Sequence, residues 1–236
     1  MNVLIVHAHP EPQSFAAAMC QSASEWLREA GHQVCVSDLY ERGFNPVAGP
    51  NDFGQRRDAG YLNYALEQRH AQELGTLAAD VQDELDLLLW CDVLILNFPI
   101  FWCAPPAILK GWFDRVLVSG RVYGGKRFYD RGGLVGKRAL VAATIGGQQH
   151  MFAPDGIHGP IDAMLKPVLQ GTLAYTGMTV LPPFIAWHVP YITADARAEL
   201  LQDYRVYLSR LDALVPLAFP QLDQFDPQLR PLRTPR

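Results

Sequence analysis

The sequence has no long apolar run and no cysteine pattern typical of a disulfide or zinc framework. Its apolar runs are about as long as one strand, too short to span a bilayer as a helix. Met1 leads directly into apolar residues, without the basic segment and cleavage site of a signal peptide. The cysteines, at positions 20, 35, 91 and 103, are scattered. We therefore expect a cytoplasmic protein with reduced thiols and no membrane insertion.

The sequence also has no strong excess of positive or negative charge. Lys and Arg number 20 against 24 Asp and Glu, which gives a formal net charge of -4. No run of five like charges occurs, so nothing favours nucleic-acid binding. Hydrophobic residues make up 49% of the 236 residues and charged residues 19%, a balance that excludes a largely disordered chain.

Strand-length apolar runs alternate with segments of helical periodicity along the chain. The pattern predicts strands at 2–6, 33–40, 93–98, 138–144 and 179–182. It predicts helices at 14–29, 78–90, 105–117, 161–176 and 193–213. Such alternation is typical of a parallel sheet covered by helices on both faces, so we expect a doubly wound five-stranded sheet of order 2-1-3-4-5.

Two segments do not fit this alternation. Residues 41–76 are rich in Gly, Asn, Asp and Arg and are too long for an ordinary crossover loop, which indicates a functional insertion. Residues 216–236 contain five prolines and are expected to run over a surface or a neighbouring subunit. We therefore predict one α/β domain at 1–215, with the long insertion at 41–76, followed by a proline-rich tail at 216–236.

The ends of the predicted strands indicate where a ligand would bind. In an open parallel sheet, ligands lie outside the carboxyl ends of the strands, where the strand order reverses. The loop 9–15 leads into a predicted helix N-terminus capped by Ser14, a place that suits a phosphate. Neither GxGxxG nor GxxxxGK[ST] is present, so neither a Rossmann dinucleotide turn nor a P-loop is indicated.

Aromatic residues and glycines gather at the same expected edge. Residues 98–102 place three aromatic side chains around Pro99, and Gly146-Gly147 follows a buried strand. Together they favour a planar aromatic cofactor, although each alone is equally consistent with core packing. His158 lies in a glycine-flanked loop where a solvated side chain is the usual reading. No carboxylate or cysteine near His7 and His9 completes a metal site, so we expect no metal.

These motifs resemble those of the DT-diaphorase group of NAD(P)H quinone oxidoreductases, in the flavodoxin-like superfamily. The most specific stretch is Phe98-Pro99 together with PAILKGWFDRV at 106–116. Ala8-His9 with Ser14-Phe15, DLY at 38–40 with FNP at 44–46, and GIHG at 156–159 are also similar. The resemblance runs from about residue 3 to 226 and implies two-electron reduction of quinones by NAD(P)H, through bound FAD and a ping-pong hydride-transfer mechanism.

The resemblance also implies roles for individual residues. The residues that match flavin-binding positions are His9, Ser14, Phe15, Ala16, Asn63, Pro99, Ile100, Phe101, Trp102, Cys103, Thr144, Ile145, Gly146, Gly147 and Arg197. The residues that match the substrate pocket are Trp102, Tyr123, Gly124, Gly125, Phe152 and His158, of which His158 and Phe152 occupy the catalytic positions. Because relatives supply the segment matched by 123–125 from a partner subunit, a homodimer with shared active sites is implied.

Three departures from the family pattern affect these expectations. Ala16 stands where relatives have an Asn that contacts the pyrophosphate, and Cys103 replaces a Phe of the pocket. Phe152 stands where relatives have the catalytic Tyr that partners the histidine matched here by His158. A phenyl ring donates no hydrogen bond, so we expect His158 to act alone or with water and Phe152 to serve as a ring wall.

A second branch of the superfamily leaves an alternative open. The ancillary oxidoreductase subunits of glutathione-gated potassium efflux systems bind FMN and carry HF and LPPF segments similar to Met151-Phe152 and 181–184. In that reading the protein would be a regulatory partner of a membrane transporter. The long insertion at 41–76 favours the FAD-binding branch. A reductase of azo or nitro compounds is a further alternative, because the same reduced flavin can attack them.

Overall fold

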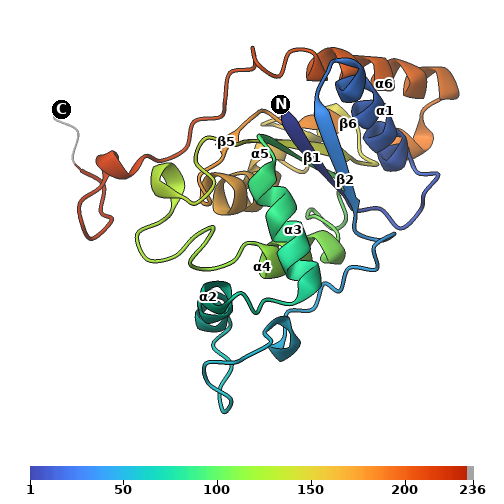
Figure 1. Ribbon diagram of the computed structural model, residues 1–236. Helices are drawn as coiled ribbons and strands as arrows, with labels where there is room; N and C mark the ends of the chain where they lie inside the picture. The colour runs from blue at the N-terminus through green and yellow to red at the C-terminus, as the bar shows by residue number, and fades with distance from the viewer. Residues whose placement is uncertain (233–236) are drawn as a thin grey trace.

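The computed structural model describes residues 1–232 and contains one parallel sheet (Figure 1). Its strands are β1 (Asn2–His7), β2 (Gln33–Asp38), β3 (Val93–Pro99), β4 (Arg138–Thr144), β5 (Thr179–Val180) and β6 (Phe184–Ala186). The order β2-β1-β3-β4-β5 confirms the predicted topology. β6 also pairs with β4, so the last strand is in two pieces. Pro182 and Pro183 lie between the pieces, where the missing N–H groups interrupt the hydrogen bonding.

Helices cover both faces of this sheet. They are α1 (Phe15–Glu29), α3 (Ala79–Trp90), α4 (Ala107–Val116), α5 (Ile161–Val168) and α6 (Ala194–Leu208), whereas α2 (Tyr64–Leu74) lies apart from the sheet (Figure 1). α1 and α6 pack side by side over one face, and α3, α4 and α5 lie over the other (Figure 1). None of the helices within residues 1–232 is long and apolar enough to cross a membrane.

Local capping signals set the ends of α1 and α6. The Ser14 hydroxyl accepts a hydrogen bond from the Ala17 N–H at 3.1 Å, and Thr193 caps α6 in the same way through Ala196. Gly31, just beyond α1, has a φ of 83°, which only glycine adopts without strain. The two predicted helix starts are therefore confirmed, although α6 ends at Leu208 rather than at residue 213.

The helix predicted at 161–176 is present, but its second half is not α-helical. α5 ends at Val168, and residues Leu169–Ala174 form a short π-helix. Pro167 has no N–H and its ring clashes with the preceding turn, so the α-helical hydrogen bonding is disturbed there.

The insertion at 41–76 is folded and is held to the domain by a buried arginine. It contains the 3₁₀ turn Pro50–Asp52 and the helix α2, which the sequence pattern did not predict. Arg115 of α4 forms ion pairs with Asp52 at 2.7 Å and with Asp80 at 2.6 Å. Tyr64 donates its hydroxyl to Asp52 at 2.5 Å, so α2 joins the same network.

The proline-rich tail runs along the edge of its own domain. The Leu217 N–H donates to the Val180 carbonyl of β5 at 2.9 Å, and Leu217 and Phe219 pack against the larger apolar core. The Leu222 N–H donates to the Asp130 carboxylate at 3.0 Å. The final part of the predicted tail, at 233–236, lies outside the described residues.

Candidate functional site

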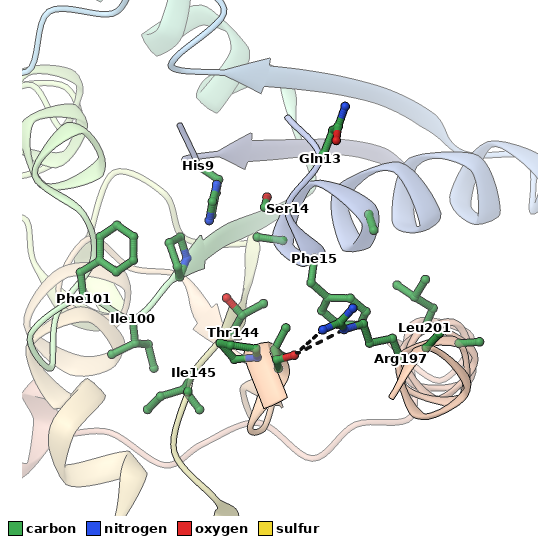
Figure 2. Close-up of a pocket in the computed structure, with 18 residues that line it drawn as sticks. His9, Gln13, Ser14, Phe15, Ile100, Phe101, Thr144, Ile145, Arg197 and Leu201 are labelled. Atoms are coloured by element: carbon green, nitrogen blue, oxygen red, sulfur yellow. Dashed lines mark hydrogen bonds between the residues drawn. The ribbon is translucent and has the colours of Figure 1, made fainter. Parts of the chain in front are cut away.

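A cavity of about 680 Å³ lies at the carboxyl edge of the sheet, where the sequence placed it (Figure 2). It is bounded by the loops after β1, β3 and β4 and by the first turns of α1 and α6. Eleven of the predicted cofactor residues line it: His9, Ser14, Phe15, Ala16, Pro99, Ile100, Phe101, Thr144, Ile145, Gly146 and Arg197. His9 and Arg197 are 188 positions apart in the sequence, so it is the fold that brings these residues together around one cavity.

The wall formed by α1 suits an anion. Ser14 uses its own oxygen to cap the helix, while the N–H groups of Phe15 and Ala16 have no acceptor within residues 1–232. Free N–H groups at a helix N-terminus, together with the helix dipole, favour a phosphate. Beside this wall, on α6, the only hydrogen-bond partner of the Arg197 side chain within residues 1–232 is the Val189 carbonyl, at 3.4 Å (Figure 2). Its positive charge has no carboxylate partner in the described part of the chain.

His9 presents a hydrogen-bond donor at the mouth of this cavity. The Glu11 N–H donates to His9 Nδ1 at 3.0 Å, so Nδ1 carries no proton and the neutral ring holds its proton on Nε2. Burial lowers the pKa of His9, and the neighbouring His7 lowers it further. His7 itself is buried with its Nδ1 2.6 Å from Asn97 Oδ1. Within residues 1–232, no three His, Cys, Asp or Glu side chains are grouped to hold a metal ion.

The loop after β4 exposes two further N–H groups. Three successive carbonyls, those of Ile145, Gly146 and Gly147, accept hydrogen bonds from the segment 188–189 at 2.9–3.2 Å. The N–H groups of Gly146 and Gly147 have no acceptor among the described residues. Gly146 lines the cavity, so this loop can offer N–H donors to a planar ring placed there.

Phe152 packs directly beneath that loop. Its side chain is buried, and a Cβ atom built on Gly147 would lie 2.6 Å from Phe152 Cε2. The Phe152 ring centroid is 4.9 Å from that of His158 and 5.5 Å from that of Trp187. His158 is exposed. The phenyl ring thus lies next to both Gly147 and His158, but neither Phe152 nor His158 lines the cavity.

The loop after β3 is the most exposed part of the site. Phe101 lines the cavity and is 46% exposed, and its ring centroid is 6.4 Å from that of His9. Trp102 is 99% exposed, and it adopts a φ of 49° while Cys103 has a φ of 62°. Positive φ values are strained for such residues. Trp102, Cys103 and Gly147 are next in sequence to lining residues but do not line the cavity themselves.

Besides Phe152 and His158, four further predicted residues do not line this cavity. Asn63 caps α2 by accepting from the Leu66 N–H at 3.3 Å. Tyr123 packs against Tyr175, with ring centroids 6.2 Å apart. Gly124 and Gly125 border a separate cavity of about 250 Å³ beside α2. Within one chain, these residues do not reach the loops after β1, β3 and β4.

Other lining residues carried no signal in the sequence. They are Gln13, Ala18, Val189, Pro190, Ala194, Ala198 and Leu201. All but two come from the segment 189–201, which reaches the cavity because α6 packs against α1. In the sequence, the segment 189–201 was linked to the site only by Arg197, which lies one turn after the helix cap Thr193 and matches a flavin-binding position.

Comparisons with known proteins agree with this geometry. A family model described as a flavodoxin-like fold matches residues 1–208. The NAD(P)H dehydrogenase [quinone] 1 of Rattus norvegicus is 37% identical over 226 residues, which cover 95% of this chain and 82% of the rat protein. The ribosyldihydronicotinamide dehydrogenase [quinone] of Homo sapiens is 40% identical over 195 residues, which cover 82% of this chain and 84% of the human protein.

A solved structure shows the same likeness over almost the whole chain. A "putative quinone reductase" from Klebsiella pneumoniae superposes with a TM-score of 0.94 at 36% sequence identity. The match covers 98% of this chain and 93% of the other.

Proposed function

The chain belongs to the flavodoxin-like family that contains the NAD(P)H dehydrogenases [quinone], and from this premise we propose that it reduces quinones with electrons from NAD(P)H through a bound flavin. One observation carries the proposal. A single cavity at the carboxyl edge of the sheet offers free N–H groups at the N-terminus of α1 and at Gly146-Gly147. The first set suits a phosphate, and the second suits the electron-rich edge of a planar ring.

The size and lining of the cavity fit such a cofactor. Its volume of about 680 Å³ falls within the range of roughly 300–1,000 Å³ that is usual for small-molecule sites. Pro99, Ile100, Phe101 and Ile145 provide flat or apolar contacts, and Arg197 supplies a positive charge without a carboxylate partner in the described part of the chain. A phosphate and an aromatic ring therefore both have complementary surroundings.

We assign the parts of the site accordingly. The α1 N-terminus, with Ser14, Phe15 and Ala16, and Arg197 would bind the phosphates, and the loops 99–101 and 144–147 would hold the ring. A bound flavin supplies the two-electron chemistry, and the protein contributes binding, orientation and electrostatics. On the substrate side, His158 would donate a proton or hydrogen bond to the quinone oxygen, with Phe152 as a wall that fixes the loop.

We propose FAD as the flavin, because the insertion 41–76 is a folded element. Its helix α2 and the turn Pro50–Asp52 are fixed to α4 by Arg115, so the insertion presents a defined surface. The alternative cofactor is FMN, which needs no contact with such a segment. In this proposal Asn63, at the start of α2, would approach the adenine end of FAD.

We also propose that the active form is a homodimer. Asn63, Tyr123, Gly124 and Gly125 match flavin and substrate positions of the family, yet none lines the cavity of its own chain. A second copy that places these residues over the cavity would complete the site for the quinone. Size-exclusion chromatography with light scattering tests this point, since a monomer that turns over quinone would contradict it.

The first experiment is the absorption spectrum of the purified protein, followed by chromatography of the flavin released by heat. Released FAD, together with oxidation of NADH or NADPH that depends on added quinone, is the expected result. Released FMN would instead favour the transporter-associated branch and direct attention to a membrane partner. If no flavin binds, even after incubation with FAD or FMN, the proposal is wrong.

A further inference from the structure

We propose that His188 is a positioning residue, which fixes the direction of the Gly147 N–H toward the flavin and thereby sets the reduction potential of the flavin. The inference rests on the proposed function. Neither the family pattern nor the sequence pattern drew attention to this residue, which lies 42 positions from Gly146.

His188 binds the loop after β4 through both its backbone and its ring. The His188 N–H donates to the Gly147 carbonyl at 2.9 Å, and Nδ1 lies 2.9 Å from the Gly146 carbonyl oxygen. The next residue, Val189, donates its N–H to the Ile145 carbonyl at 3.2 Å. The segment 188–189 therefore holds three consecutive peptide groups of the loop from one side.

An unusual backbone conformation makes this double contact possible. His188 has φ 56° and ψ 24°, in the left-handed region, where it precedes the 3₁₀ turn Val189–Tyr191. Residues other than glycine seldom adopt this region, although Asn, Asp and His do so more often than most. A strained residue beside a ligand cavity is a recognised mark of a functional constraint.

The protonation state of the ring follows from its partners. A carbonyl oxygen only accepts hydrogen bonds, so Nδ1 must carry a proton. In the neutral ring, Nε2 is then an acceptor, and it faces the Gln148 side-chain amide, whose nitrogen lies 3.5 Å away. His188 is therefore a fixed donor to Gly146 whether the ring is neutral or charged.

The contact with Gly146 determines where the next N–H points. In a planar trans peptide, the carbonyl oxygen and the following N–H point in opposite directions. Holding the Gly146 carbonyl toward His188 therefore turns the Gly147 N–H away from His188. Glycine on both sides of this peptide leaves its rotation unhindered by side chains, so an external hydrogen bond is needed to fix it.

This fixed orientation has a consequence for redox chemistry. Preorganised N–H donors stabilise a negatively charged ligand more than a neutral one. A flavin gains negative charge on reduction, so the Gly147 N–H held in place by His188 would favour the reduced state over the oxidised state. Losing the Nδ1 contact should lower the midpoint potential and leave the affinity for oxidised flavin less affected.

The variants His188→Asn and His188→Asp separate this role from general packing. Both residues tolerate the left-handed conformation and place an atom near the position of Nδ1. The Asn amide can donate to the Gly146 carbonyl, whereas the Asp carboxylate can only accept and repels it. We expect His188→Asn to retain the wild-type potential. We expect His188→Asp to shift the reduced-to-oxidised equilibrium at least tenfold, which is about 30 mV for a two-electron couple.

The measurement is the midpoint potential of the bound flavin, obtained by titration against redox dyes, with flavin affinity measured by fluorescence quenching. His188→Gly provides a second comparison should the Asp variant fail to fold, because glycine keeps the backbone conformation and removes the ring. Gln148→Ala is the matched control, since it removes only the Nε2 contact and should leave the potential unchanged.

The outcomes distinguish the inference from the function on which it rests. Equal potentials in the wild type and in His188→Gly or His188→Asp, with flavin bound and quinone reduced, would overturn the role of His188 alone. If the midpoint potential shifted equally in His188→Asn and His188→Gly, the imidazole would act through packing, and the proposed role of His188 would also be overturned. Failure of the wild-type protein to bind any flavin would instead refute the proposed function.

Discussion

Replacing Asp52 by Asn should destabilise the protein strongly, because Asp52 neutralises a buried arginine. The Arg115 side chain is 3% exposed and that of Asp52 is 5% exposed. Asp52 accepts two hydrogen bonds from Arg115, one from the Tyr64 hydroxyl and one from the Gly49 N–H. An Asn side chain has one accepting oxygen for these donors, and its amide group would face another donor.

The magnitude follows from the burial of the pair. Removing one partner of a buried ion pair costs about 3–5 kcal/mol, because the other charge stays desolvated. Asp80 remains 2.6 Å from Arg115 and retains part of the compensation, so we expect the lower end, about 3 kcal/mol. With a urea slope of about 3 kcal/mol per molar for a chain of this size, the unfolding midpoint should fall by about 1 M.

The matched control is Asp114→Asn, which breaks an exposed pair on α4. Lys110 and Asp114 lie 2.7 Å apart with side chains 62% and 48% exposed. Such a pair contributes only about 0.3–0.5 kcal/mol, so its midpoint should fall by less than about 0.2 M. Both variants must be unfolded at one flavin concentration, because bound ligand adds stability by mass action. Equal midpoint shifts in the two variants would refute the assignment of Arg115 as the anchor of the insertion.

Acid should remove the stabilising contribution of Asp52 in the wild-type protein. Burial would raise the pKa of Asp52, but hydrogen bonds from Arg115, Tyr64 and Gly49 outweigh it and hold the pKa below its usual value. A carboxyl group with a lowered folded-state pKa stabilises the fold above its unfolded pKa of about 3.9 and loses that effect as the pH falls through its folded pKa. The difference in unfolding free energy between wild type and Asp52→Asn should therefore be constant near neutral pH and shrink below about pH 4.

Three further predictions concern the candidate site. Gly147→Ala should weaken flavin binding measured by fluorescence titration, because the new Cβ would lie 2.6 Å from Phe152 Cε2 and the loop after β4 would have to shift. Ser14→Ala should lower the unfolding free energy by about 1 kcal/mol through loss of the α1 cap, and an unchanged urea midpoint would contradict the role of the Ser14 hydroxyl. His158→Ala should lower kcat with quinone by roughly 100-fold or more if the imidazole transfers a proton, and unchanged stopped-flow rates in both half-reactions would exclude that role.

Much of the fold was predictable because its signals are local. The apolar runs at 93–96 in β3 and 139–143 in β4 are buried on both faces, which is typical of central strands. Ser14, Gly31 and Thr193 mark helix ends through bonds or dihedral angles that involve only near neighbours. Parallel strands place their carboxyl ends at one edge, so the strand order itself located the cavity.

Other features depended on packing between distant segments. The helix α2 has a polar sequence with few apolar positions, and it is stabilised by Asp52 and Arg115 rather than by its own periodicity. The entry of residues 189–201 into the cavity depends on α6 packing against α1.

The sequence by itself determined the strand order, the edge of the sheet that carries the cavity, and the resemblance of its loops to those of flavin-binding proteins. Only the tertiary structure decided that His188 holds the Gly146 carbonyl and that Tyr123 and its neighbours lie away from the cavity of their own chain. The physical reason is that periodicity and capping act over a few residues. A contact between residues 42 positions apart instead depends on how whole elements pack.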